Sequence, residues 1–179
     1  MFRRSSNRRR RSLRRCRCRR RPPRRSRVRP IAERLPAYVL LEDGACFNGT
    51  APLGFEPACA EVVFTTNLSG YQEVFTDPSY LGQMVVMTAP MIGNYGINPE
   101  DIESDRPRVA GVVVRELSLK PSNWRSTGSL LEWLSEAKVP VVADVDTRQL
   151  TRHIRSQGAM RGVMAVGDAP TDAVRQALT

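Results

Sequence analysis

Residues Ser129–Val166 read SLLEWLSEAKVPVVADVDTRQLTRHIRSQGAMRGVMAV and alternate between helix and strand signals. Ser129 and Glu132 form a capping box ahead of an apolar helical pattern, which predicts a helix that runs to about Lys138. Val139–Ala143 follows as an apolar run of the length expected for a buried strand. The stretch therefore indicates an α/β domain.

The second half of this stretch repeats the same alternation. Asp146 is placed to cap a helix that Gly158 ends, and Met160–Val166 then predicts another strand. Leu150 and Ile154 share the buried face of this helix. The solvent-exposed face of this helix carries three arginines, Arg148, Arg152 and Arg155.

Apolar and β-branched runs earlier in the chain predict further strands, and a turn at Asp43-Gly44 joins the first two as a hairpin. These strands are Ala37–Leu41, Ala45–Gly49, Glu61–Thr66, Met84–Ala89 and Val109–Arg115. Thr50–Pro57 is expected to be a loop, and Pro170 opens a final helix. The order predicts a mixed α/β domain with helices on one side of a sheet. Because no G-x-G-x-x-G or P-loop motif is present, a nucleotide site in this chain is not expected.

Gly70–Pro107 is unusually rich in turn-forming residues. Tyr71–Phe75 predicts one helical turn, and Asp77-Pro78-Ser79-Tyr80 has the residue types of a helix start. Gly93 and Gly96 bracket a turn that needs unusual φ angles. The acidic segment from Asn98 to Asp105 predicts a solvated loop rather than a calcium loop.

The residues that could support catalysis or metal binding are few. His153 is the sole histidine, and no cysteine belongs to a C-x-x-C pair, so we expect no metal site. A hydrolase built on Cys59 and His153 requires these side chains within hydrogen-bonding reach, and we expect them to be far apart. Cys46 lies in a strand after the Asp43-Gly44 turn, while Cys59 is expected in a Pro-rich loop. We therefore expect no catalytic residue in this chain, and a reduced, cytoplasmic setting.

The first part of the chain differs sharply from the rest. Residues 1–35 hold 17 Arg and one acid, whereas the remainder holds 11 Lys+Arg and 17 Asp+Glu, a net charge of −6. Residues 1–36 are predicted to be a disordered arm, and they have the composition of translated leader upstream of a start near Val28. The alternative is a basic nucleic-acid-binding protein that acts through residues 1–35. No run is long and apolar enough for a membrane helix.

From Leu40 onward the chain resembles the N-terminal domain of the carbamoyl-phosphate synthase small subunit, the glutamine-hydrolysing subunit. The segments that carry this resemblance are LEDGACFNG (Leu41–Gly49), EVVFTTNLSGYQEVFTDPSY (Glu61–Tyr80), APMIGNYGINPEDIES (Ala89–Ser104), VAGVVVREL (Val109–Leu117), PSNWRS (Pro121–Ser126) and DVDTRQLTRHIRSQGAMRGV (Asp144–Val163). The resemblance implies a three-layer β/β/α swivelling domain over residues 37–179. It also implies a role in supplying glutamine-derived ammonia to an ATP-using large subunit, for arginine and pyrimidine synthesis.

In this family, hydrolysis takes place in a second, C-terminal class I amidotransferase domain, and we expect that domain to be absent from this chain. The resemblance implies one substrate contact here, a hydrogen bond from Ser79 to glutamine. The alternative for Ser79 is a helix-start residue that only satisfies backbone groups. Asn94, Tyr95 and Gly96 are expected to be architectural. The resemblance implies no cofactor in this chain, because the large subunit binds ATP and Mg.

Overall fold

A computed structural model describes residues 34–178, so the predictions for the arginine-rich arm and for a start near Val28 lie outside the described residues. The elements up to the middle of the chain are β1 (Arg34–Leu41), β2 (Cys46–Pro52), β3 (Ala58–Thr65), α1 (Tyr71–Thr76), a 3-10 turn (Pro78–Tyr80), β4 (Met84–Met87), β5 (Met91–Ile92), β6 (Gly111–Val113) and β7 (Glu116–Leu117). They are followed by α2 (Leu130–Glu136), β8 (Val141–Val142), α3 (Thr147–Gln157), β9 (Met160–Val166) and α4 (Asp172–Gln176).

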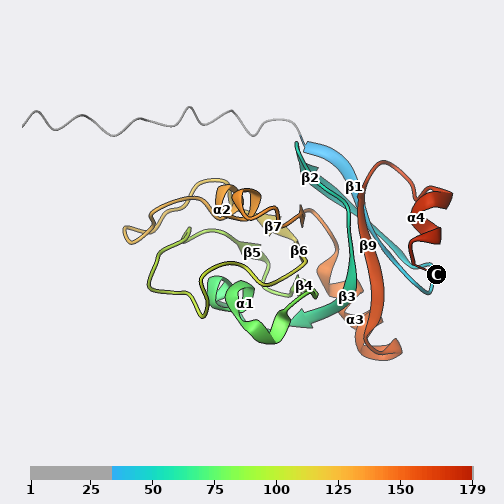
Figure 1. The fold of residues 1–179 in the computed structure, drawn as a ribbon, viewed down its shortest axis with the longest axis horizontal. Helices are drawn as coiled ribbons and strands as arrows, with labels where there is room; N and C mark the ends of the chain where they lie inside the picture. Colours follow the sequence, from blue (N-terminus) through green and yellow to red (C-terminus); the bar gives the residue numbers. More distant parts are fainter. Residues whose placement is uncertain (1–33, 179) are drawn as a thin grey trace, which may run out of the picture.

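Seven strands form one mixed sheet in the order β2-β1-β9-β3-β4-β6-β8, and β5 pairs with β7 separately. The pairs from β2 to β3 are antiparallel, whereas those from β3 to β8 are parallel. The sheet curls until its two ends meet, since Thr50 in β2 bridges Ala143 beside β8. The Thr50 N–H donates to the Ala143 carbonyl at 2.7 Å, and the Ala143 N–H returns a bond at 2.8 Å. The result is an almost closed barrel (Figure 1).

Side-chain alternation along the strands sorts the core into layers. In β4, Met84 and Val86 face the barrel interior, where they pack with residues of β1, β3 and β9. Val85 and Met87 face the opposite way, onto α1 and α2. The order is thus an antiparallel wall, a parallel wall and a helical layer, which confirms the mixed α/β class and the β/β/α layering.

The expectation that the helices lie on one side of the sheet is wrong. Leu150 and Ile154 of α3 pack into the barrel interior. Tyr38 and Leu40 of β1 point outward and pack with Leu178, just after α4. Helix α4 therefore covers the outer face of β1 and β9, on the side away from α1 and α2 (Figure 1). Because both faces of β1 are buried, other elements must pack against each of them, and α4 packs against the outer face.

Most predicted elements are confirmed, with differences at their ends. Residues 34–36, predicted to belong to the arm, form the start of β1. Strand β2 continues to Pro52, so the predicted loop is shorter. Strand β3 begins at Ala58, so Cys59 lies in a strand and not in a loop. Each extra segment has a pairing partner that local sequence does not reveal, namely β2 for Arg34 and β9 for Cys59.

The predicted caps of α3 are confirmed in their geometry. The Asp146 carboxylate accepts the Gln149 backbone N–H at 2.9 Å, and Gly158 has a φ of 99°.

Within residues 34–178 no helix is long and apolar enough to cross a membrane.

Replacing Asp146 with Ala is expected to lower the free energy of unfolding by about 1 kcal/mol, because a backbone N–H of α3 then loses its acceptor. Urea denaturation measures this loss. The control is Thr171→Ala, because Thr171 occupies the same position on α4 but makes no side-chain capping bond. Equal losses in the two variants would contradict a capping role for Asp146.

Candidate functional site

The turn after α1 presents Ser79 to solvent. One Asp77 carboxylate oxygen accepts the Ser79 backbone N–H at 2.7 Å, and the Tyr80 N–H donates to the Asp77 carbonyl at 3.1 Å. The Ser79 N–H, and then its side chain, hold the pKa of Asp77 below its ordinary value. Pro78 supplies a preset φ at the first position of the turn. The predicted helix start is therefore confirmed as a 3-10 turn with a fixed, exposed serine.

This arrangement suits binding rather than nucleophilic catalysis. A hydroxyl that donates to Asp77 keeps its oxygen lone pairs for a ligand N–H. A serine nucleophile requires a base such as histidine, and the sole histidine, His153, pairs with Asp43 instead. Ser79 can thus offer one or two hydrogen bonds to a polar ligand.

A stacked tyrosine pair fixes α1 to the turn between Gly93 and Gly96. The ring centroids of Tyr71 and Tyr95 are 4.0 Å apart, and the Tyr95 hydroxyl accepts the Tyr71 backbone N–H at 2.9 Å. The Tyr71 hydroxyl donates to the Gly96 carbonyl at 2.6 Å. Burial raises the pKa of Tyr71, and Tyr95 raises it further, so this hydroxyl stays protonated as a donor. The predicted positive φ angles are confirmed, at 89° for Gly93 and 72° for Gly96.

The acidic segment after this turn is attached to α1 more firmly than its sequence indicates. Asn98 is only 7% exposed, and its backbone N–H and carbonyl both bond the Gln72 side chain. Farther along, the Thr76 hydroxyl accepts the Glu103 N–H at 2.9 Å, and the Ser104 hydroxyl donates to the Thr76 carbonyl. The prediction of a solvated loop holds for the exposed Glu103 but is wrong for Asn98. Sequence reasoning missed this buried clamp because its partners are 26 residues apart.

Cys59 and His153 do not pair, as expected. The Cys59 thiol contacts the Ala177 carbonyl at 3.7 Å, while His153 Nε2 bonds Asp43 at 2.5 Å. Cys59 alternates with Ala60, which faces the barrel interior, so its thiol lies on the α4 face, opposite to α3. Cys46 lies in β2, as predicted, and burial raises the pKa of its thiol. Neither thiol therefore has a histidine base.

The His153–Asp43 pair connects α3 to the hairpin turn between β1 and β2. Burial alone favours a higher pKa for Asp43, but the Ala45 N–H and His153 outweigh it and leave that pKa below its ordinary value. The His153 ring also packs edge-on against Phe47, with centroids 6.0 Å apart. The sole histidine is thus half-buried and joins two elements.

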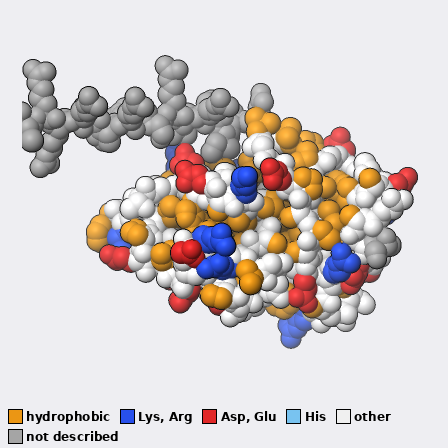
Figure 2. All heavy atoms as spheres, in the orientation of Figure 1, with side chains coloured by type: hydrophobic (Ala, Val, Ile, Leu, Met, Phe, Trp, Pro, Cys, Tyr) orange, Lys and Arg blue, Asp and Glu red, His pale blue; other side chains and the backbone are white. Residues whose placement is uncertain are grey.

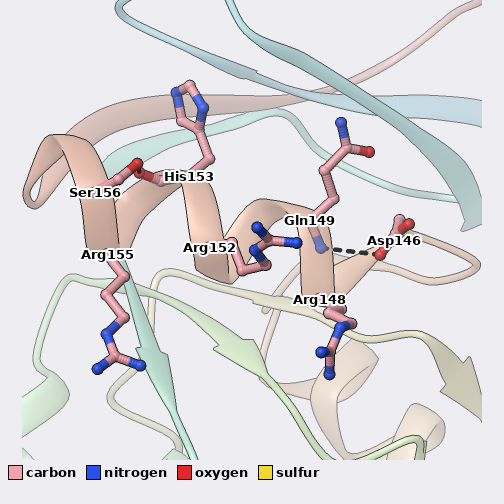
Figure 3. Close-up of a pocket in the computed structure, with 7 residues that line it drawn as sticks. All are labelled: Asp146, Arg148, Gln149, Arg152, His153, Arg155 and Ser156. Atoms are coloured by element: carbon pink, nitrogen blue, oxygen red, sulfur yellow. Dashed lines mark hydrogen bonds between the residues drawn. The ribbon is translucent and has the colours of Figure 1, made fainter.

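A second feature is an open groove along the polar face of α3, with a volume of about 830 Å³ (Figure 3). Its lining consists of Asp146, Arg148, Gln149, Arg152, His153, Arg155 and Ser156. The helical periodicity predicts these exposed arginines, and every residue that lines the groove belongs to α3 or to its N-cap, Asp146.

Comparison with known proteins gives one consistent result. The family model for the carbamoyl-phosphate synthase small chain, CPSase domain, matches residues 39–164. The carbamoyl phosphate synthase small chain of Solidesulfovibrio magneticus is 54% identical over 131 residues, which cover 73% of this chain and 35% of that relative. The pyrimidine-specific small chain of Bacillus subtilis is 48% identical over 140 residues, 78% of this chain and 38% of the relative. The chain therefore spans about a third of the length of the curated relatives it matches.

Proposed function

The chain belongs to the carbamoyl-phosphate synthase small chain family, and we propose that residues 37–179 act as the N-terminal domain of its glutaminase subunit. In this role the domain supports the transfer of ammonia from glutamine to an ATP-using large subunit, for arginine and pyrimidine synthesis. It is not catalytic alone, and ATP and Mg belong to the large subunit. The proposed location is the cytoplasm, where exposed thiols such as Cys46 and Cys59 stay reduced.

The observation that carries this proposal is the exposed Ser79 on its hydrogen-bonded turn. We propose that the Ser79 hydroxyl binds glutamine when a class I amidotransferase domain is present. Asp77 and Pro78 fix the backbone of the turn, so little conformational freedom is lost when the hydroxyl meets its ligand. The tyrosine pair and the Gln72–Asn98 clamp hold the helix from which this turn projects.

Replacing Ser79 with Ala is expected to raise the KM for glutamine about tenfold with little change in kcat, because one hydrogen bond to the bound substrate is lost. Ammonia release is measured with the amidotransferase domain of a relative supplied as a partner or a fusion. The matched control is Ser135→Ala, an exposed serine on α2 that is expected to leave KM unchanged.

An unchanged KM in the Ser79 variant would leave that residue with only its turn-forming role. A separate measurement tests the claim that the domain is not catalytic. Ammonia release by the purified chain alone, retained after Cys46 and Cys59 are both changed to Ala, would contradict that claim.

A further inference from the structure

An apolar groove of about 260 Å³, which we call the α2 groove, is lined by the loop between β2 and β3, by α2 and by the start of β8. Its buried lining consists of Leu131, Val139 and Val141, each at most 9% exposed. Leu53 and Phe55 also line it, and Leu53 is 59% exposed. The three buried residues belong to the core under α1 and α2, whereas Phe55 packs against the barrel interior. The groove therefore lies where the two cores meet at the surface.

The described chain begins at one end of the α2 groove. Arg34 pairs with Pro52 of β2, and Pro52 lines the groove. Arg34 also lines a small cleft that shares Pro52 and two core residues with the groove. Residues 1–33 precede this point, and a chain spans at most about 3.3–3.6 Å per residue. Ile31 is thus tethered within about 11 Å of Arg34, which brings the groove within its reach.

The residues just before Arg34 have a composition that suits an apolar groove. Within residues 14–33 the only aliphatic side chains larger than alanine, proline apart, are Val28 and Ile31, and Pro30 lies between them. A proline fixes its own φ and restricts the residue before it. Such a segment loses less conformational freedom on binding than a chain without proline does.

The charges around the α2 groove complement those of the preceding chain. Glu56 lines the groove, and Glu132 and Glu136 of α2 each follow a lining residue in the sequence. All three are exposed, and within residues 34–178 none of them forms an ion pair. Among the described lining residues Lys138 is the only cation. Residues 24–29 hold four arginines, so an acidic rim lies within reach of a basic segment. Figure 2 shows hydrophobic side chains gathered at the upper end of β2, with acidic side chains nearby.

We propose that residues 28–33 of this chain occupy the α2 groove. Ile31 packs against the apolar lining, and the arginines before it lie beside the exposed glutamates. Docking of this segment removes Leu53 and the buried lining from water and joins the two cores at the surface. The groove is then covered by the chain itself and is not open to another protein. Docking there is independent of the Ser79 turn and of the proposed function.

The test is disulfide trapping in the full chain, with its four cysteines changed to serine. Ile31→Cys is combined with Ser135→Cys, an exposed position of α2 that lines the groove. Because a disulfide requires two Cα atoms within about 7 Å, the bond forms quickly only when residue 31 lies in the groove. In oxidised glutathione this pair is expected to close within one chain at least about ten times faster than the control pair. The control pair is Ile31→Cys with Ser156→Cys, an exposed serine of α3 outside the α2 groove.

A third variant distinguishes docking from simple proximity. Leu53→Asp places a charge on the groove lining and is expected to slow closure to about the rate of the control pair. Leu81→Asp is its matched control, because Leu81 is 68% exposed and lies outside the groove. It is expected to leave the rate of closure unchanged.

Thermal unfolding gives an independent measure in the chain with its native cysteines. Ile31→Asp is expected to lower Tm by about 2–4 °C, because the apolar contact with the groove is lost. Leu13→Asp makes the same kind of change earlier in the chain and is expected to leave Tm unchanged.

Faster closure at Ser135 that Leu53→Asp alone abolishes would support the docking. Equal rates at Ser135 and Ser156, no slowing by Leu53→Asp, or a Tm that Ile31→Asp does not lower would each overturn it. Disulfides that form between two chains instead of within one would assign the groove to a second copy, which also overturns the proposal. None of these results bears on glutamine or ammonia, so the proposed function is tested separately.

Discussion

Replacing Gly96 with Ala is expected to lower the free energy of unfolding by about 2–5 kcal/mol. Two costs add. Gly96 has a φ of +72°, where an L side chain costs about 1–2 kcal/mol. A Cβ at this position would also collide with the Ser126 hydroxyl and lie 2.6 Å from the Gly128 carbonyl, and overpacking of this kind costs about 1–3 kcal/mol.

Gly82 provides a matched control for this substitution. Its φ of +73° is nearly the same, but a Cβ there would meet nothing within 4 Å. Gly82→Ala is therefore expected to show the backbone cost alone, about 1–2 kcal/mol. Urea denaturation of the two variants separates the close approach at Gly96 from its backbone conformation. Equal losses would show that the neighbouring loop moves aside at little cost.

The backbone at Gly96 matters because two distant segments meet there. The Gly96 carbonyl accepts the Tyr71 hydroxyl, while Ser126 and Gly128 of the loop before α2 occupy the space that a Cβ at Gly96 would need. In addition, the Ile97 N–H donates to the Gly128 carbonyl at 3.1 Å. A side chain at Gly96 would separate these segments and loosen α1, the helix that leads into the Ser79 turn.

Features set by residues close together in the chain could be predicted from the sequence. Asp146 and Gly158 cap α3 as expected, and Gly44 forms the hairpin turn with a φ of 89°. The all-apolar strands β4 and β9 are also where the sequence predicts them. In each case the deciding interaction spans at most four residues or follows a simple period.

Features that depend on distant partners could not be predicted in this way. The barrel closes through Thr50 and Ala143, which are 93 residues apart and each look like ordinary strand-end residues. The cover that α4 places on β1 is a partial exception, because the large side chains of Tyr38 and Leu40 alternate with the inward-facing Val39, so both faces of the strand require burial. The sequence Asp77-Pro78 predicts the turn that carries Ser79, but it does not predict the ligand. Glutamine is proposed as the ligand of Ser79 from the family resemblance alone.

The clamp between Gln72 and Asn98 is the second position where one substitution is expected to have a large effect. The Gln72 amide nitrogen donates to the Asn98 carbonyl at 2.7 Å, and its amide oxygen accepts the Asn98 N–H at 2.9 Å. Both residues are buried, at 2% and 7% exposure. Gln72→Leu keeps a side chain of similar size but leaves two buried backbone groups unpaired, so it is expected to cost about 2–4 kcal/mol.

Gln83→Leu is the matched control for this change. Gln83 also donates through its amide nitrogen, to Glu61 at 2.7 Å, but that bond is at the surface and water can replace it. The control is therefore expected to lose no more than about 0.5 kcal/mol. Urea denaturation gives both values, and hydrogen exchange at the Asn98 amide gives a local measure, since its protection should fall in Gln72→Leu only.

The two measurements together distinguish a local clamp from a general core residue. If Gln72→Leu lowers global stability but Asn98 stays protected, the cost comes from packing around α1 and not from the unpaired amide. If both fall, the segment after Gly96 is held by this one side chain, and the Ser79 turn should loosen with it, because both are attached to α1. In that case Gln72→Leu is also expected to raise the KM for glutamine, although the clamp side chain is buried and Ser79 is exposed.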